Sequence, residues 1–357
     1  MVDERVRRLA ELLVDYSTEV KEGDRVLIRA DLPAQELALE VYRQALLRGA
    51  HPWIRAEIPG WRYIFFRYAS EEQLKFFPEH EFAEIKNTDV YISLGAPLNL
   101  RELSNVDPAR ISARLRVLKP IRDWRVEKTR WVVFYYPTNA LAQEAGMSLP
   151  EFEDFVFNAC LIDWGEVSRR LHEIKRVLDA TDRVRIVGLD TDLEFSVKGR
   201  NSVVADGKHN MPDGELFTSV VEDSVNGEVY FDIPAVLYGN VVEDIHLTFK
   251  DGRVVEARAA RNQPFLEKML ATDEGARRLG EFGIGLNYGI KRPVKNILFD
   301  EKIGGTIHLA LGRGYKETLS RNDSAIHWDM IKDLRGGGEI YFDGKLVMKD
   351  GKWLIGE

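Results

Sequence analysis

The chain of 357 residues contains little cysteine and little histidine. Its one cysteine, Cys160, excludes an internal disulfide and a cysteine-rich metal site. Cys160 stands in an apolar helical run, so we expect it in the core rather than at a reactive site. With only seven histidines, any metal site must rely on carboxylates.

Long apolar runs are also missing. No stretch approaches the roughly 20 apolar residues that span a bilayer, and residues 1–6 are charged rather than an apolar signal core. We therefore expect a cytoplasmic protein in a reducing compartment, with no membrane partner. The net charge of −8, from 50 basic and 58 acidic residues, argues against a dedicated nucleic-acid binder.

Familiar catalytic motifs are absent as well. The sequence has no Gly-x-x-x-x-Gly-Lys-Ser/Thr loop, no Gly-x-Ser-x-Gly elbow and no His-Glu-x-x-His helix. The first predicted strand runs into residues 29–33 (RADLP) without the glycines that bring backbone N–H groups to a phosphate. Dinucleotide binding is therefore disfavoured.

The first half alternates helical and strand patterns. Strands are predicted at 25–29, 53–58, 89–95 and 130–136, with helices between them at 34–47 and 108–124 and a helix start at Ser70. Strands separated by helices predict a mostly parallel sheet. A long helical stretch at 148–178 follows.

The second half has short alternating runs between Asn-Gly and Asp-Gly turns, which predicts mainly antiparallel strands. A helix is predicted near 264–279. We therefore expect an α/β N-terminal domain, residues 1–180, that could cap a cleft. A β-rich α+β catalytic domain, residues 181–357, is expected to follow it.

Two strand-like segments carry candidate metal ligands. In residues 304–312, His308 alternates with apolar positions and lies beside small residues, although a single strand histidine is more often structural. In residues 324–330, His327 and Asp329 share one side of the strand while Trp328 points to the other. An imidazole and a carboxylate on one face suit a divalent ion, or else the Asp orients its neighbouring His.

Two glutamates occupy glycine-flanked positions. Glu215 follows a Pro-Asp-Gly turn at the start of a predicted strand, and Glu281 follows a predicted helix end. Either one alone is more often a solvated surface group. Together with the two histidines and Asp329, they match the ligand types of a two-metal hydrolase.

A rival cluster of carboxylates could hold Mg²⁺ or Ca²⁺. Asp190, Asp192 and Glu194 would share one face of a strand. We interpret them as a solvated face rather than a metal site.

At these residues the sequence resembles the thermophilic metalloaminopeptidases, which include aminopeptidases T, S and II. The resemblance rests on five runs in residues 181–357, namely 210–215 (NMPDGE), 224–227 (SVNG), 278–285 (RLGEFGIG), 300–312 (DEKIGGTIHLALG) and 324–329 (SAIHWD). The first half is similar to this family more loosely, through residues 23–28 and the helix after them.

The resemblance implies a site with two divalent ions. Its metal ligands would be Glu215, Glu281, His308, His327 and Asp329, and Glu301 would be a ligand or a neighbour of the ligands. Glu281 and Tyr315 would be the catalytic residues. The family suggests Zn²⁺ or Co²⁺, the ligand types also admit Mn²⁺, and the resemblance further implies a homodimer.

The expected activity is removal of the N-terminal residue from peptides with a free N-terminus, by a water that two metals activate. Two alternatives remain at this point. One is another metal-dependent amide hydrolase, a deacylase or dipeptidase. The other is a non-enzymatic, metal-stabilised protein that binds peptides.

Overall fold

The computed structural model describes residues 3–355 and divides them into two compact units. The first unit extends to Leu161 and takes in Gly207–Pro212. The second contains Ile162–Asp206 and the chain from Asp213 onward. The helix α10 (Trp164–Leu178) therefore belongs to the second unit.

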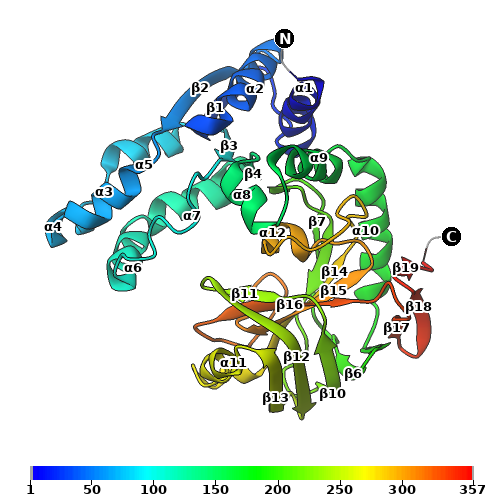
Figure 1. Cartoon of the computed structure of the whole chain (residues 1–357). Coiled ribbons are helices and arrows are strands. Elements are labelled where there is room, and N and C mark those ends of the chain that lie inside the picture. Colours follow the sequence, from blue (N-terminus) through cyan, green and yellow to red (C-terminus); the bar gives the residue numbers. More distant parts are fainter. Residues whose placement is uncertain (1–2, 356–357) are drawn as a thin grey trace. The chain divides into compact units, whose positions relative to one another are not determined.

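The first unit is built on a parallel sheet with the strand order β2-β1-β3-β4-β8 (Figure 1). Its strands are β1 (Arg25–Asp31), β2 (His51–Glu57), β3 (Val90–Gly95), β4 (Arg130–Tyr135) and β8 (Asn210–Met211). Its helices are α1 (Glu4–Glu11), which continues as a π-helix over Leu12–Ser17, α2 (Gln35–Leu47), α3 (Trp61–Tyr68), α4 (Glu71–Lys75), α5 (Glu79–Lys86), α6 (Pro108–Val117), α7 (Lys119–Lys128), α8 (Asn139–Glu144) and α9 (Leu149–Cys160).

Two predicted helices are each divided in the structure. The stretch 108–124 forms α6 and α7, and the stretch 148–178 forms α9 and α10. The second division falls at Asp163, whose carboxylate accepts the backbone N–H of Glu166 and caps α10. Ser70 caps α4, as the sequence predicted, and the structure adds a full capping box with Gln73.

The second unit contains two antiparallel sheets (Figure 1). The nine-stranded sheet has the order β11-β12-β10-β6-β5-β17-β18-β19, with β13 paired to β12. Its strands are β5 (Arg183–Gly188), β6 (Thr191–Ser196), β10 (Asn226–Phe231), β11 (Ala235–Leu237), β12 (Asn240–Lys250), β13 (Arg253–Arg261), β17 (Glu339–Phe342), β18 (Lys345–Lys349) and β19 (Lys352–Trp353).

The five-stranded sheet has the order β16-β15-β14-β9-β7. It consists of β7 (Val203–Ala205), β9 (Glu215–Thr218), β14 (Leu279–Gly285), β15 (Thr306–Gly312) and β16 (His327–Asp333). The helices α11 (Gln263–Leu270) and α12 (Ile297–Asp300) complete the unit.

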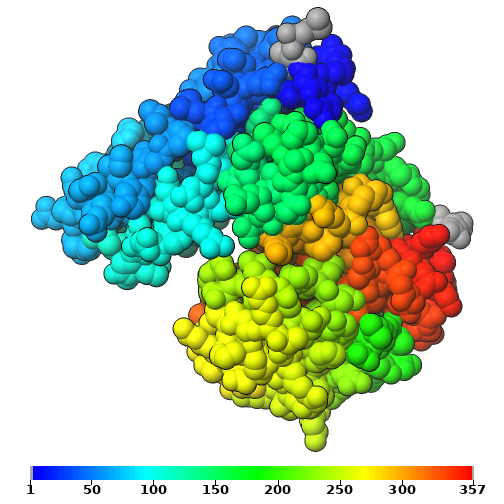
Figure 2. Space-filling view, viewed as in Figure 1, coloured from blue at the N-terminus to red at the C-terminus, as the bar shows by residue number. Residues whose placement is uncertain are grey.

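A shared apolar core joins the two sheets of the second unit. Phe195 of β6 and Phe282 of β14 are fully buried there, with ring centroids 5.1 Å apart. Side chains close the gaps that the ribbons leave in this unit, as the space-filling view shows (Figure 2). Since one face of the five-stranded sheet is anchored in this core, its other face is free to carry polar side chains.

The parallel first half and the β-rich second half confirm the predicted fold class. The predicted helix at 264–279 was too long, because α11 ends at Leu270. Asp273 fixes the following turn by accepting the backbone N–H groups of Ala276 and Ala325. Glu281 therefore lies within strand β14 and not at a helix end. No helix within residues 3–355 has both the length and the apolar character that crossing a bilayer requires.

Candidate metal centre

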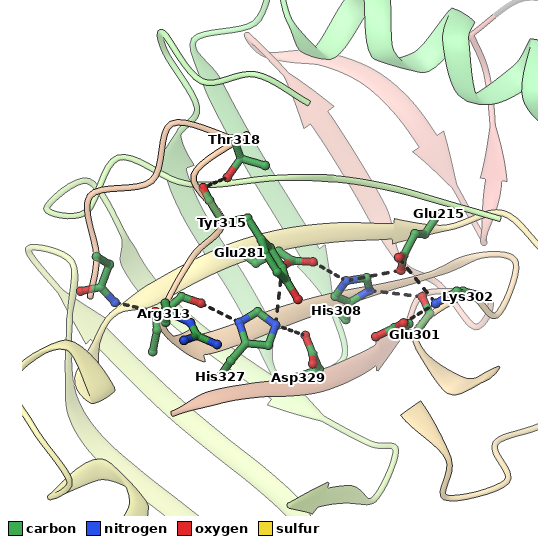
Figure 3. Close-up of polar contacts among 12 residues, drawn as sticks. Glu215, Glu281, Glu301, Lys302, His308, Arg313, Tyr315, Thr318, His327 and Asp329 are labelled. Carbon is green, nitrogen blue, oxygen red and sulfur yellow. Dashed lines mark hydrogen bonds and ion pairs between the residues drawn. The ribbon is translucent and has the colours of Figure 1, made fainter. Parts of the chain in front are cut away.

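Four strands of the five-stranded sheet bring the predicted ligands together. In the register of these strands, Gly283 of β14 pairs with His308 of β15, and Ala310 of β15 pairs with both Glu281 and Asp329. Glu215 enters from β9, on the other side of β14. Alternation along each strand puts these side chains on one face, where they converge (Figure 3).

The distances define a compact polar cluster. His308 Nε2 lies 3.1 Å from Glu281 Oε1 and 3.9 Å from Glu215 Oε2. His327 Nε2 lies 3.6 Å from Glu281 Oε2 and 3.4 Å from Asp329 Oδ1. All five predicted ligands therefore meet at one place. Their apolar strand neighbours, such as Trp328, point to the core and are buried.

Two overlapping groups of three residues have the geometry of a metal site. Glu215, Glu301 and His308 form one group, and Glu281, His308 and Asp329 form the other; within each, one ligand atom per residue lies within 4.8 Å of the others. His308 is common to both. Glu301, which was predicted to be a ligand or a neighbour of the ligands, is thus part of the cluster.

Both histidines are oriented as metal ligands usually are. The Nδ1 atoms of His308 and His327 face the backbone carbonyl oxygens of Glu301 and Arg313, at 3.2 Å and 2.6 Å. A carbonyl oxygen only accepts, so each Nδ1 carries a proton, and each Nε2, which faces carboxylates, is the atom that would bind a cation in place of a proton.

Unsatisfied carboxylate oxygens also fit bound cations. Glu215 Oε2 and Glu281 Oε2 are buried without a hydrogen-bond partner. Leaving a buried carboxylate oxygen without a hydrogen bond is costly, and a divalent ion would remove that cost. The residues therefore fit the metal that the ligand types predict.

Burial and neighbouring charges shift the pKa values of the groups in this cluster. Burial raises the pKa of Glu215 and of Glu281. Burial acts against a charged imidazole at His308, but the hydrogen bond to Glu281 and the charge of Glu215 outweigh it and raise the His308 pKa to about 10. The His327 pKa is raised to about 9, where the neighbouring Asp329 outweighs burial.

A buried lysine that the sequence reading did not single out completes the cluster. Lys302 is fully buried, lies 3.5 Å from Glu215 Oε1 and is ion-paired with Glu301 (Figure 3). Burial lowers the lysine pKa, but Glu215 and Glu301 more than offset this and raise it. Lys302 is thus a fixed positive charge beside the carboxylates.

Tyr315 lies at the edge of the same cluster. Its ring centroid is 5.1 Å from that of His327, and its side chain points toward the space between the two histidines (Figure 3). Partial burial and the charge of Glu281 raise the pKa of Tyr315. The phenol therefore keeps its proton and can donate a hydrogen bond.

The rival acidic cluster pairs with arginines instead. Asp192 and Glu194 form exposed ion pairs with Arg185 and Arg183, and Asp190 lies in the turn before β6. Cys160 is buried, and burial raises its thiol pKa well above the ordinary value. The acidic cluster therefore lacks the arrangement of a metal site, and Cys160 lacks that of a nucleophile.

Comparison with known proteins identifies the class. Residues 2–353 match the model of the family described as thermophilic metalloprotease (M29). Aminopeptidase 2 of Geobacillus stearothermophilus is 30% identical over 407 residues, which cover 98% of this chain and 95% of that protein. The chain is therefore a peptide hydrolase, and it belongs to the thermophilic metalloprotease family.

Solved structures share the fold. Wild-type AmpT from Thermus thermophilus superimposes with a TM-score of 0.84 at 22% identity, over 99% of this chain and 100% of that one. A 2,5-dihydroxypyridine dioxygenase from Pseudomonas putida has a TM-score of 0.65 at 15% identity, over 98% and 96%. Because proteins named for different activities share this fold, the function of this chain must be argued from its site.

Proposed function

We propose that this peptide hydrolase is an aminopeptidase that removes the N-terminal residue from peptides and holds two divalent ions. The observation that carries the proposal is the pair of overlapping ligand groups joined at His308. Glu215, Glu301 and His308 would hold one ion, and Glu281, His308 and Asp329 the other, with His327 beside Glu281 and Asp329. Zn²⁺ or Co²⁺ is the expected metal, and Mn²⁺ also suits these ligand types.

When bound, such ions lower the pKa of water from 15.7 toward about 7 and polarise a carbonyl. One oxygen of the Glu281 carboxylate would bind an ion, and the other would accept a proton from the attacking water. The Tyr315 hydroxyl donates a hydrogen bond to the oxygen on which negative charge develops. The positive charge of Lys302 opposes the rise in pKa that burial causes at Glu215 and Glu301, and its ion pairs hold both carboxylates in place.

The relatives' names favour exopeptidase action. Several curated relatives along most of the chain are called aminopeptidases, among them Aminopeptidase 2. A deacylase would act on an acylated amine and a dipeptidase on a free dipeptide, and either could use the same ligands. A homodimer and a cytoplasmic location, expected from the sequence, remain part of the proposal.

A panel of amino-acid p-nitroanilides tests the proposal. Each substrate is offered with a free amine and with an acetylated amine, at matched concentration. We expect hydrolysis of the free-amine series and none of the acetylated series. Release of p-nitroaniline from the acetylated series would contradict an aminopeptidase, and release of acetate from it would show a deacylase. Cleavage of the dipeptide Leu-Leu without cleavage of any p-nitroanilide would show a dipeptidase.

A further inference from the structure

One face of the parallel sheet in the first unit carries polar residues, although both faces of such a sheet are normally apolar. Parallel strands are usually covered on both faces and rich in aliphatic residues throughout. Here one face holds buried apolar side chains, among them Ile28, Ile92 and Phe134. The opposite face carries Arg29, Asp31, Glu57, Ser93, Gly95, Val133 and Tyr135.

These residues form two adjoining rows at the carboxyl ends of the strands. Arg29 pairs with Ser93, and Ser93 with Val133; one pleat further on, Asp31 pairs with Glu57, and Gly95 with Tyr135. All seven line a cavity of about 390 Å³. The segments that follow β2 and β3 supply the rest of its wall.

The cavity lies at the switch point of the sheet. The chain runs from β1 to β2 on one side and then returns to β3 on the other, so the connections diverge between β1 and β3 (Figure 1). In open α/β sheets, ligands bind in the crevice at this point, outside the carboxyl ends of the strands. A cavity of this volume suits a small molecule.

The charges in the cavity are only loosely paired. Arg29 lies 3.3 Å from Glu57 and 3.7 Å from Asp31, against roughly 2.7–2.9 Å for a tight charge-assisted hydrogen bond. One oxygen of Asp31 accepts the Ala96 N–H at 2.7 Å, while the other faces Arg29. Glu57 accepts the indole N–H of Trp61 at 2.7 Å. The Arg29 guanidinium and the Asp31 carboxylate thus lie side by side, and each can form further hydrogen bonds with a ligand.

This charge pattern selects a zwitterion. A simple anion would meet Asp31, Glu57 and Glu102, and a simple cation would meet Arg29 and Arg62. An ammonium and a carboxylate two bonds apart match the adjacent Asp31 and Arg29. Exposed apolar side chains at the cavity, Trp61, Leu98 and Leu100, suit an apolar substituent.

We propose that this cavity binds a free apolar α-amino acid, with its carboxylate on Arg29 and its ammonium on Asp31. Tyr135 forms part of the floor, because its ring lies so close to Gly95 that a Cβ there would approach it to 2.7 Å. Such amino acids are the product class of the proposed activity, but the site does not depend on that activity.

Equilibrium dialysis of the full chain against radiolabelled L-leucine tests the proposal, with leucinamide and 4-methylpentanoate as analogues that lack one charge. With the protein treated with chelator, so that leucinamide is not hydrolysed to leucine, we expect leucine to bind and each analogue to bind at least about tenfold more weakly, since each loses a charge-assisted contact. Equal binding of either analogue would overturn recognition of a zwitterion.

Four variants locate the bound leucine. Ser93→Leu fills the cavity and should abolish this binding, and the isosteric Asp31→Asn should weaken it about tenfold or more. Ser112→Leu, the same change at an exposed serine of α6, should leave it unchanged. Glu281→Gln should also leave it unchanged. Leucine binding that survives Ser93→Leu but is lost in Glu281→Gln would place the amino acid in the metal site and overturn the inference.

Discussion

At the scale of single residues, the candidate centre depends on how each imidazole is held. Backbone carbonyls fix Nδ1 of His308 and His327, so both Nε2 atoms face carboxylates. The sequence predicted the five converging ligands from alternation and from the family resemblance. It gave no measure of the distances between them, because those depend on strand pairing between residues far apart in the chain.

Lys302 shows why part of the site escaped prediction. A lysine in a sequence is ordinarily a solvated surface residue, and only the fold buries this one between Glu215 and Glu301. The available signal was its position next to Glu301, in the run 300–312 that also carries His308. That position favours a role for Lys302 in the site, but it does not show that the side chain is buried.

Tyr315→Phe tests the role of the phenol. The substitution removes one hydrogen-bond donor and leaves all the proposed metal ligands in place. We expect kcat for leucine p-nitroanilide to fall by about 10²–10³, the cost of losing one oxyanion donor, with metal content unchanged. Normal turnover by this variant would show that Tyr315 does not stabilise the transition state.

At the scale of elements, the pairing of β14 with β15 leaves no room for a side chain at Gly283. A Cβ on Gly283 would lie 1.9 Å from His308 Nε2, because the two residues are paired across β14 and β15. The sequence predicted the β15 strand correctly, but it assigned the segment before β14 to a helix. The close approach of Gly283 to His308 could therefore not be predicted.

Gly283→Ala should disrupt both the strand pair and the metal site. We expect a loss of about 1–3 kcal/mol in the free energy of unfolding, typical of overpacking, together with loss of bound metal. Gly336→Ala is the matched control, since nothing lies within 4 Å of its added Cβ. Urea unfolding and metal content measure both effects, and a Gly283→Ala variant with full metal content would contradict this reading of the strand pair.

An ion pair between two neighbouring strands of the first unit gives a pH prediction. Arg25, at the start of β1, donates to both oxygens of Asp89, just before β3, at 2.8 Å and 2.9 Å. The hydrogen bonds from Arg25 lower the pKa of Asp89 to about 2. An aspartate with a lowered folded-state pKa stabilises the fold above its ordinary pKa, and this stabilisation is lost as pH falls toward 2.

Asp89→Asn should therefore lower the urea midpoint at pH 7, and its difference from the wild type should shrink as pH falls below about 4. The effect is modest because both side chains are partly exposed. Glu22→Gln, at an exposed site of the same unit, should show no such trend. A difference between Asp89→Asn and wild type that stays constant down to pH 2.5 would contradict the assignment.

At the scale of the whole molecule, all the proposed ligands belong to the second unit, while the first unit carries the polar cavity of its parallel sheet. The order of strands and helices made both architectures predictable from the sequence. The cavity was not predicted, because its residues come from four strands and acquire a common face only through sheet register.

Metal removal should destabilise the chain as well as inactivate it. Ligand binding to the folded state contributes about 2.7 kcal/mol at 100 times Kd. Since all the proposed ligands except Glu301 lie on four strands, we expect chelation to lower the melting temperature by about 5–10 °C. Differential scanning calorimetry before and after chelation measures this, and an unchanged melting temperature would argue against ions bridging these strands.

The most direct test of the central claim combines metal content with activity. Elemental analysis of the purified chain, paired with leucine p-nitroanilide hydrolysis before and after chelation, addresses both parts together. The account predicts two divalent ions per chain, loss of hydrolysis on chelation, and recovery with Zn²⁺, Co²⁺ or Mn²⁺. A chain that binds no metal and hydrolyses nothing with any of the three ions would contradict it.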